Sequence, residues 1–503
     1  MAEVSRSIPQ SINYQDVLPV AVPAIARRRR FYPQNGTVFN ALGTQEIRIQ
    51  LESVNSLLDP RASYLEMFLF NTTAGAGAQT FGMDLGGAHA LFDEVWVEQG
   101  GRVLAREQAH NRLHAGVLSV AQVNDDGGFA ESVTALQRGC NAAGGGAVNQ
   151  VNPFAVGGNG DAYVNRNHND VAQVPANTGV RLTMAMPTGL FTQNKLIPLP
   201  LVDQSSPITL CFRMAQADVP GVWSAAIAAN ALEIRRINYV AQLIEVGGDV
   251  LNQFRQMQGM GGGQLTISST DWEHSQGTLP TQLGGGEVII RVPIRKRSVK
   301  SLFWQANSQD LTNGAGGLLL SDLYNLSFGG NCNTVEWQLK VGSVVYPPTP
   351  VQGWGATTLA GAEALNPGRG ECAMELAKAL GTLGFTNPTG RLSGITYGLN
   401  NQLAPGLGQP ALADGDNGDG AGANIATQSQ QIASVCPFGL DLDAFQQTAI
   451  EAGLDSETLA QETNLVLTVD NGGSGAEDKN IHTWILFDQH YYFNADGNIT
   501  ISN

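Results

Sequence analysis

Short runs in which apolar and polar residues alternate predict β-strands along the whole chain. In the first run, Ile47, Ile49 and Leu51 alternate with two polar residues, the period-two pattern of a strand with one buried face. Similar runs lie at 64–70, 92–98, 180–184, 208–214 and 237–246, and later at 265–268, 288–294, 302–304, 334–341, 465–469 and 481–487. Small turn residues at 100–101 and 342–343 predict tight hairpins between neighbouring runs. Pro347 and Pro348 are expected to end the strand that follows the second hairpin.

The same order of features occurs twice, which divides the chain into two domains. Each half opens with a basic cluster beside a strand-like run, passes through long Gly/Asn/Ala-rich segments and closes on a dense β-type run. Many short strands with Gly/Pro turns and little helix favour an all-β fold of two tandem jelly rolls. We expect an N-terminal arm at 1–30, a first roll at 31–246 with an insertion at about 124–180, a linker at 247–263, and a second roll at 264–503 with an insertion at about 353–430.

Three short segments have helical patterns. Residues 107–121 place Leu113, Val117 and Leu118 near one helical face. Residues 250–254 suggest a short helix in the linker. Residues 373–380 form the third, and Gly381 is expected to end it.

Composition favours a chain that buries surface in assembly. The 503 residues suit two to three domains. Charged residues make up only 14%, against about 25% in an ordinary domain. Because the centres of protein interfaces are depleted of Lys, Glu and Asp, a charge-poor chain fits a subunit of an assembly. A loop-rich monomer that avoids charge is the alternative.

Charge, cysteines and segment hydrophobicity exclude several classes. The net charge of −16 repels nucleic acid and anionic membranes over most of the surface. The five cysteines are scattered and never in Cys-x-x-Cys spacing, which argues against a disulfide scaffold and a zinc ribbon. No apolar run approaches the roughly 18 residues of a membrane span, and the N-terminus lacks the apolar region of a secretory signal.

The sequence gives no complete catalytic or metal site. His110 and His114 share a helical face, but the general-base glutamate of His-Glu-x-x-His is missing and no third ligand is evident. Closely spaced carboxylates at 414–420 resemble a calcium-binding loop, but with Gly420 as the loop glycine the first ligand position is Gly415 and no glutamate closes the loop. No nucleophile elbow or phosphate-binding loop occurs. We therefore expect no enzyme, cofactor or metal, although carboxylates paired across the fold stay open.

Four consecutive arginines, Arg27, Arg28, Arg29 and Arg30, are the one candidate site. They could contact nucleic acid phosphates, pair with acidic groups of neighbouring subunits, or belong to a solvated arm. A second basic cluster, Arg295-Lys296-Arg297, lies in a strand-like run and indicates a strand edge or an interface.

The order of these segments resembles the double jelly-roll major capsid proteins of polinton-like viruses, virophages and related large eukaryotic DNA viruses. No single segment is diagnostic, and the two insertions depart from the family. The resemblance rests on the order and spacing of segments at 31–40, 46–51, 57–60, 63–65, 84–92, 95–98, 111–114, 195–201, 207–210 and 239–246, and then at 292–294, 298–303, 337–343 and 346–348.

The resemblance implies a structural protein of the virion. Two eight-stranded jelly rolls would stand perpendicular to the shell, and three chains would form a pseudo-hexagonal capsomer. Capsomers would tile an icosahedral shell around double-stranded DNA, assembled inside the host cell. Neighbouring capsomers, penton proteins and minor capsid proteins would be partners, and the N-terminal arm would lie inside, in reach of packaged DNA.

Two other classes of function stay open from the residues alone. A β-sandwich that binds carbohydrate or acts on glycosides would show a cleft with paired carboxylates. A nucleic-acid-binding protein would act through the arginine arm, although the net charge of −16 argues against it.

Overall fold

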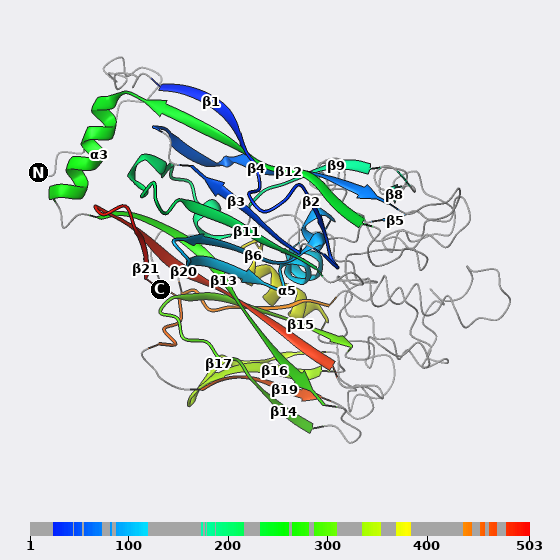
Figure 1. Ribbon diagram of the computed structural model, residues 1–503. Coiled ribbons are helices and arrows are strands. Elements are labelled where there is room, and N and C mark those ends of the chain that lie inside the picture. The colour runs from blue at the N-terminus through cyan, green and yellow to red at the C-terminus, as the bar shows by residue number, and fades with distance from the viewer. Residues whose placement is uncertain are drawn as a thin grey trace, which may run out of the picture.

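In the computed structural model the chain folds into four antiparallel sheets that form two jelly rolls (Figure 1). A further pair of two-residue strands, β5 (Phe81–Gly82) and β8 (Gln173–Val174), lies outside the four sheets. The structure describes residues 24–502 except for 44, 53–54, 73–80, 83–86, 119–172, 175–176, 178, 187, 216–231, 261–263, 281–285, 309–333, 354–368, 384–435, 445–452, 458–461 and 470–478. Most of both predicted insertions, including the acidic segment 414–420, lies outside these residues.

The first roll is made of two facing sheets. One has the order β1-β12-β4-β10, with β2 paired to β12 and β9 to β4, and the other has the order β3-β11-β6-β7. The strands of the first sheet are β1 (Ala24–Phe31), β2 (Val38–Asn40), β4 (Leu57–Asn71), β9 (Gly179–Met184), β10 (Ile197–Pro198) and β12 (Leu232–Val246). Those of the second are β3 (Glu46–Leu51), β6 (Phe92–Gln99), β7 (Arg102–Gln108) and β11 (Ile208–Met214).

The second roll repeats this plan. Its sheets have the orders β13-β20-β15-β18, with β21 paired to β20, and β14-β19-β16-β17. The first comprises β13 (Gln264–Leu279), β15 (Val299–Ser308), β18 (Phe438–Asp441), β20 (Lys479–Asn494) and β21 (Ile499–Ser502). The second comprises β14 (Gly286–Arg291), β16 (Thr334–Val341), β17 (Val344–Gln352) and β19 (Thr463–Val469).

The two rolls share one topology. In each, the first strand pairs with the last long strand (β1 with β12, β13 with β20), and the hairpin strands form the edge of the other sheet (β6-β7, β16-β17). This repetition confirms the predicted tandem jelly rolls. By position, β13 corresponds to β1 and β17 to β7.

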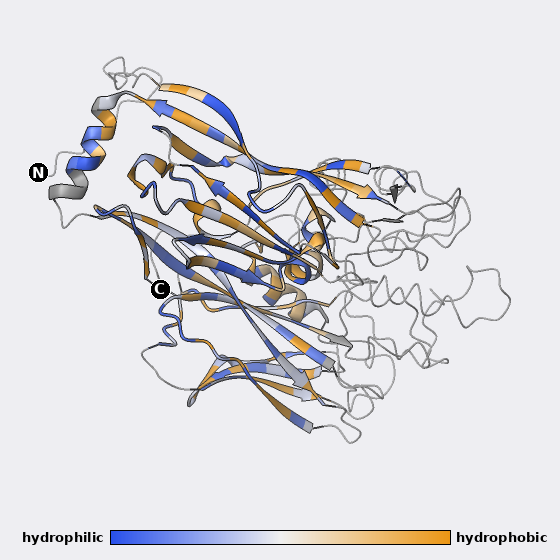
Figure 2. Cartoon of the chain, viewed as in Figure 1, coloured by the Kyte–Doolittle hydropathy of each residue, from blue (hydrophilic) through white to orange (hydrophobic). Residues whose placement is uncertain are grey.

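Alternating residues build a core inside each roll. In β3, Ile47, Ile49 and Leu51 are buried while Arg48 is exposed, as the pattern predicts. Figure 2 shows the same alternation of apolar and polar residues along many strands. A third apolar cluster joins the rolls and contains Leu113 and Val117 of the first together with Phe303 and Trp484 of the second.

The rolls meet through a small set of elements. Strand β7 and the short helical turn η4 (Gly189–Phe191) of the first roll lie against β13 of the second. Gln489 on β20 donates a hydrogen bond to the carbonyl oxygen of Leu104 on β7 at 3.0 Å. Ser269 on β13 donates to the carbonyl oxygen of Gly189 at 2.5 Å. The covered strand of the second roll is therefore its first strand, β13.

The linker and one insertion contain helices. Helix α3 (Gly248–Met260) joins β12 to β13 and is longer than the predicted segment at 250–254. Helix α5 (Arg369–Ala379) includes most of the predicted helix at 373–380. Gly381 has a φ of 68°, and the amide of Thr382 donates to the carbonyl oxygen of Ala377, which is the glycine-ended cap that the sequence predicts.

Four local expectations are corrected by the structure. Residues 24–30, assigned to the arm, belong to strand β1 because they pair along the whole of Val240–Val246. Residues 107–108 end β7, so the helix predicted from residue 107 begins only at His110. The cluster 295–297 follows the end of β14 at Arg291 and is not in a strand. Strand β17 continues to Gln352 through its prolines, which an edge strand tolerates.

Among the described residues, no helix has the length and hydropathy required to span a bilayer.

Candidate functional site

The four arginines lie side by side on β1, the edge strand of the first roll. They pair in register with Leu243, Gln242, Ala241 and Val240 of β12. Every residue of β1 except Phe31, which is buried at the end of the strand, keeps much of its surface exposed. An edge strand presents unpaired backbone groups on one side. Charged side chains on such a strand disfavour its pairing with strands of other chains.

Each arginine has a partner within the chain. Arg27 lies 3.2 Å from a carboxylate oxygen of Glu245, and Arg30 lies 3.2 Å from Glu66. Arg28 contacts the hydroxyl of Tyr64. Arg29 pairs with Glu52. These contacts are solvent-exposed on the arginine side, so each ion pair contributes about 0–1 kcal/mol to stability.

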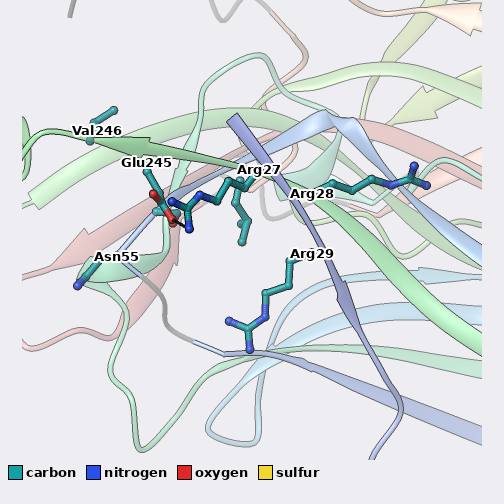
Figure 3. A pocket seen from close by; sticks show the side chains of 8 residues that line it. Arg27, Arg28, Arg29, Asn55, Glu245 and Val246 are labelled. Carbon is teal, nitrogen blue, oxygen red and sulfur yellow. Dashed lines mark ion pairs between the residues drawn. The ribbon is translucent and has the colours of Figure 1, made fainter. Parts of the chain in front are cut away.

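The arginine row borders an open groove of about 620 Å³. Figure 3 shows Arg27 turned toward Glu245, while the side chains of Arg28 and Arg29 extend in other directions. Asn55, Ser56, Leu243 and Val246 complete the lining. Among the described residues that line the groove, Glu245 is the one carboxylate, whereas a glycosidase needs two flanking the bond that it cleaves.

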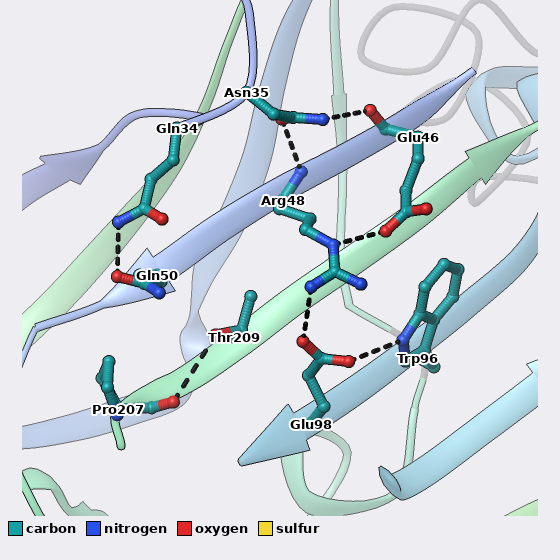
Figure 4. Close-up of polar contacts among 9 residues, drawn as sticks. All are labelled: Gln34, Asn35, Glu46, Arg48, Gln50, Trp96, Glu98, Pro207 and Thr209. Carbon is teal, nitrogen blue, oxygen red and sulfur yellow. Dashed lines mark hydrogen bonds and ion pairs between the residues drawn. The ribbon is translucent and has the colours of Figure 1, made fainter. Parts of the chain in front are cut away.

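The outer face of β3, β11 and β6 carries a connected set of polar side chains (Figure 4). Arg48 pairs with Glu46 and lies 2.9 Å from Glu98, whose other oxygen accepts a hydrogen bond from the indole of Trp96 at 3.4 Å. Trp96 is 8% exposed and lies on the face of β6 opposite to the core residues Val95 and Val97. These contacts join the side chains into one surface network.

A second cluster, which we call the histidine triad, consists of His89, His110 and His114. His89 comes from the helical turn η2 (Gly87–Leu91), His110 begins α1 (His110–Leu113) and His114 begins the π-helical turn η3 (His114–Leu118). The Nδ1 of His89 lies 3.0 Å from the Nε2 of His110. One potential ligand atom from each ring lies within 4.8 Å of the other two.

Glu107, at the end of β7, packs against this triad. One of its carboxylate oxygens lies 3.1 Å from His110 Nδ1 and 3.5 Å from His114 Nε2. Burial favours the neutral acid, but the two histidines outweigh it and lower the pKa of Glu107 to about 2. Burial also lowers the pKa of His89 and of His114. The positive charge of neighbouring histidines lowers both pKa values further.

The second roll contributes its own buried titratable groups at the junction. His274 on β13 and His482 on β20 approach to 3.0 Å between Nε2 and Nδ1, with stacked rings. Asp271 on β13 is 3% exposed. Burial, together with nearby Glu107, raises its pKa to about 8.

Sequence reasoning paired His110 with His114 but missed His89 and Glu107. His89 lies 21 residues before His110, and only the packing of η2 on α1 brings them together. Glu107 is three residues before His110, at a spacing that the predicted helix would also have placed on one side. The identity of these residues was visible, but their convergence depends on the fold.

Comparison of the whole fold with known proteins gives one consistent result. No protein-family model and no curated protein matches the sequence. Among solved structures, PBCV-1 VP54, as fitted into a cryo-EM reconstruction of the virophage Sputnik, matches with a TM-score of 0.57 at 11% identity over 97% of this chain and 99% of that one.

Two virophage structures agree with this match. The mavirus major capsid protein gives a TM-score of 0.53 at 11% identity, covering 100% of this chain and 95% of that one. The cryo-EM structure of the Sputnik virophage gives a TM-score of 0.52 at 11% identity, covering 100% and 93%. The protein has the double jelly-roll fold of these viral capsid proteins. At this identity the likeness extends to the fold, over nearly the full length of each chain.

Proposed function

We propose that this protein is a major capsid protein, a structural subunit of the virion shell and not an enzyme. One observation carries the proposal: both rolls match solved capsid proteins in tandem over at least 93% of those chains. The described groove supports this reading over a glycoside-acting enzyme, since it holds a single carboxylate. The shell would enclose double-stranded DNA and be assembled inside the host cell.

The subunit would form a homotrimer by repeating its own internal junction. Within the chain, β7 of the first roll covers β13 of the second. Of the corresponding strands, β1 of the first roll is largely exposed and β17 of the second roll is exposed or half-buried at all but one position. A second copy that places its β17 against β1 would reproduce the junction, and such a head-to-tail contact closes into a ring after three chains if each junction turns by about 60°.

Exposed apolar side chains favour the same pairing. Ile25 on β1 is 59% exposed and Val344 on β17 is 45% exposed. Leu265, the second residue of β13 as Ile25 is of β1, packs against the core of the first roll. Ile25 would find equivalent cover from a neighbouring chain. Six rolls in a ring would give the pseudo-hexagonal capsomer that tiles an icosahedral shell, with pentons and minor capsid proteins as further partners.

Arg27 to Arg30 would then lie at the junction between subunits. Their position on a paired edge strand supports this role over contact with packaged DNA. Residues 1–23, which precede β1, contain one basic residue, Arg6, against Glu3 and Asp16, so the remaining arm has no charge excess to attract phosphate.

The mass of the purified protein in solution tests the proposal. We expect a species of three times 53.2 kDa, with a hexagonal outline in negative-stain images, or closed shells. A compact monomer that persists at high concentration would overturn the capsid assignment. It would favour the alternative, a carbohydrate-binding or glycoside-acting protein.

A charge placed on β17 tests the junction itself. Val344→Arg would set a further cation against the arginine row of a neighbouring subunit, so we expect it to convert trimers into monomers. Ile289→Arg is the matched control: Ile289 is 60% exposed on β14, at the opposite edge of the same sheet. Analytical ultracentrifugation should show trimers for the control alone. Trimers in both variants would remove β17 from the interface.

Removing the arginines should relieve that repulsion. In the Val344→Arg chain, changing Arg27, Arg28, Arg29 and Arg30 to alanine should restore part of the trimer population, because the like charges that repel the introduced guanidinium are gone. The fold should survive, since the lost ion pairs are exposed. The same ultracentrifugation experiment measures the recovery. A protein that stays monomeric after loss of the four arginines would show that they do not face β17 of a neighbouring subunit.

A further inference from the structure

The histidine triad combines three features that simple packing does not require. It gathers three imidazoles from two separate segments, with His110 fully buried. His110 and His114 are four residues apart, so consecutive turns carry both rings to one side. His89 and His114 are both half-buried, so the cluster lies near the surface and not in the centre of a core.

Buried polar atoms around the triad are poorly satisfied. The Oε1 of Glu107 lies at ion-pair distance from the Nδ1 of His110 and the Nε2 of His114 but outside good hydrogen-bond geometry, and the Oε2 of Glu107 has no hydrogen-bond partner. A buried carboxylate costs several kcal/mol unless a cation or several donors compensate it. The charge of Glu107 is offset by the histidines, but the hydrogen-bonding capacity of these buried atoms is not satisfied.

The backbone that presents the triad is strained. Ala109, immediately before His110, has a φ of 50°, a left-handed conformation that costs a residue with a Cβ about 1–3 kcal/mol. The next turn, η3, is π-helical, a form that occurs mostly as single turns at functional sites. A left-handed residue precedes His110 and a π-helical turn begins at His114, so both histidines are presented by irregular backbone.

We propose that His89, His110 and His114 bind a divalent transition-metal ion of the zinc class, with Glu107 as the positioning residue. Three imidazole nitrogens suit zinc and disfavour calcium or magnesium, which prefer oxygen. Glu107 contacts the Nδ1 of His110, so His110 would bind through Nε2, the atom that faces His89. A carboxylate behind a metal-bound histidine is the usual orienting arrangement.

Metal binding requires one local movement. The rings of His89 and His114 are stacked at 4.0 Å between centroids and 5° between planes, so the lone pairs of their nitrogens lie in nearly parallel planes and cannot converge on one point between the rings. Bonds of about 2.0–2.1 Å in a tetrahedral site need nitrogens roughly 3.3 Å apart and converging. His114 must therefore turn about its side-chain bonds, and its partial exposure leaves room for this.

The site would reinforce the junction between the two rolls. Leu113 and Val117, on the turns that carry His110 and His114, pack against Phe303 and Trp484 of the second roll. A Cβ at Gly116 would collide with the side chain of Gln305, which shows how closely η3 approaches β15. An ion that fixes these turns on η2 would hold the surface on which the second roll rests. This role is independent of the proposed capsid function.

Zinc titration of the full-length protein tests the proposal. After removal of metal with a chelator, we expect one Zn²⁺ per chain by elemental analysis and a higher melting temperature in its presence. His89→Gln should abolish stoichiometric binding, and Glu107→Gln should weaken it by about 10–100-fold. Failure of the unsubstituted protein to take up one ion per chain would overturn the proposal, as would unchanged binding by His89→Gln.

His482→Gln is the matched control. Its histidine forms a second close pair with His274, but among the described residues that pair has no third ligand within reach. Binding should be unchanged in this variant, and its loss would contradict the assigned ligands. Co²⁺ added to the unsubstituted protein gives a test that needs no variant to fold, because visible absorption distinguishes a tetrahedral nitrogen-rich site from an octahedral one. An octahedral spectrum would contradict the triad.

Discussion

Trp304→Ala is expected to lower the free energy of unfolding by about 3–5 kcal/mol. Trp304 is fully buried in the core of the second roll. Its ring stacks on Phe438 with centroids 3.7 Å apart and meets Trp337 edge-on at 5.8 Å. Truncation removes these contacts and leaves a cavity that rigid neighbouring strands cannot close. Urea unfolding followed by circular dichroism measures the loss.

Trp96→Ala is the matched control for this prediction. Trp96 is also buried, but on the outer face of its sheet, where Arg213 and Glu98 cover it. Flexible surface side chains can settle into the space, so the loss should be clearly smaller than for Trp304. Equal losses in the two variants would show that the outer face of β6 is packed as tightly as a core, as a subunit interface would be.

Asp271→Asn is expected to stabilise the protein strongly at alkaline pH. Burial raises the pKa of Asp271 from 3.8 to about 8, and a rise of this size is worth on the order of 5 kcal/mol. Between these two pH values the native chain holds a proton that the unfolded chain releases, so the residue lowers stability progressively as pH rises. Asparagine has no proton to lose and keeps the acceptor for the amides of Trp272 and Arg106.

Melting temperatures from pH 4 to pH 9 measure this effect. The variant and the parent should agree near pH 4 and diverge steadily up to about pH 8. Lys296 and Glu107 also act on Asp271, with opposite signs, and both remain in the variant. Asp203→Asn is the control, because hydrogen bonds from Ser205 lower the pKa of this exposed carboxyl, and its loss should not stabilise the chain. Parallel pH profiles for Asp271→Asn and the parent would contradict the raised pKa of Asp271.

Local pattern was sufficient to predict the architecture and several element ends. β16 begins and ends where the alternation does, at Thr334 and Val341, and β12 ends at the predicted boundary, Val246. Gly381 ends α5 as expected. These features depend on side-chain alternation and backbone conformation, which neighbouring residues determine.

Features that depend on distant partners were not predictable in the same way. The sequence Ala24–Phe31 has four consecutive arginines and no alternation, and it is a strand because β12 offers a hydrogen-bonding edge. Pro347 and Pro348 suggested the end of a strand, yet β17 is an edge strand whose outer side needs no donors. His89 joins the candidate metal site only through the packing of η2 on α1.

The first and last long strands of each roll are hydrogen-bonded neighbours, so the two ends of each roll lie side by side. A unit with adjacent ends can be copied in tandem without rerouting any strand, because the second copy starts where the first one finishes. Helix α3 makes up most of the connection between β12 and β13. Each roll is therefore a unit whose entry and exit strands are neighbours, which is the arrangement that lets a domain be joined to another through a short connection.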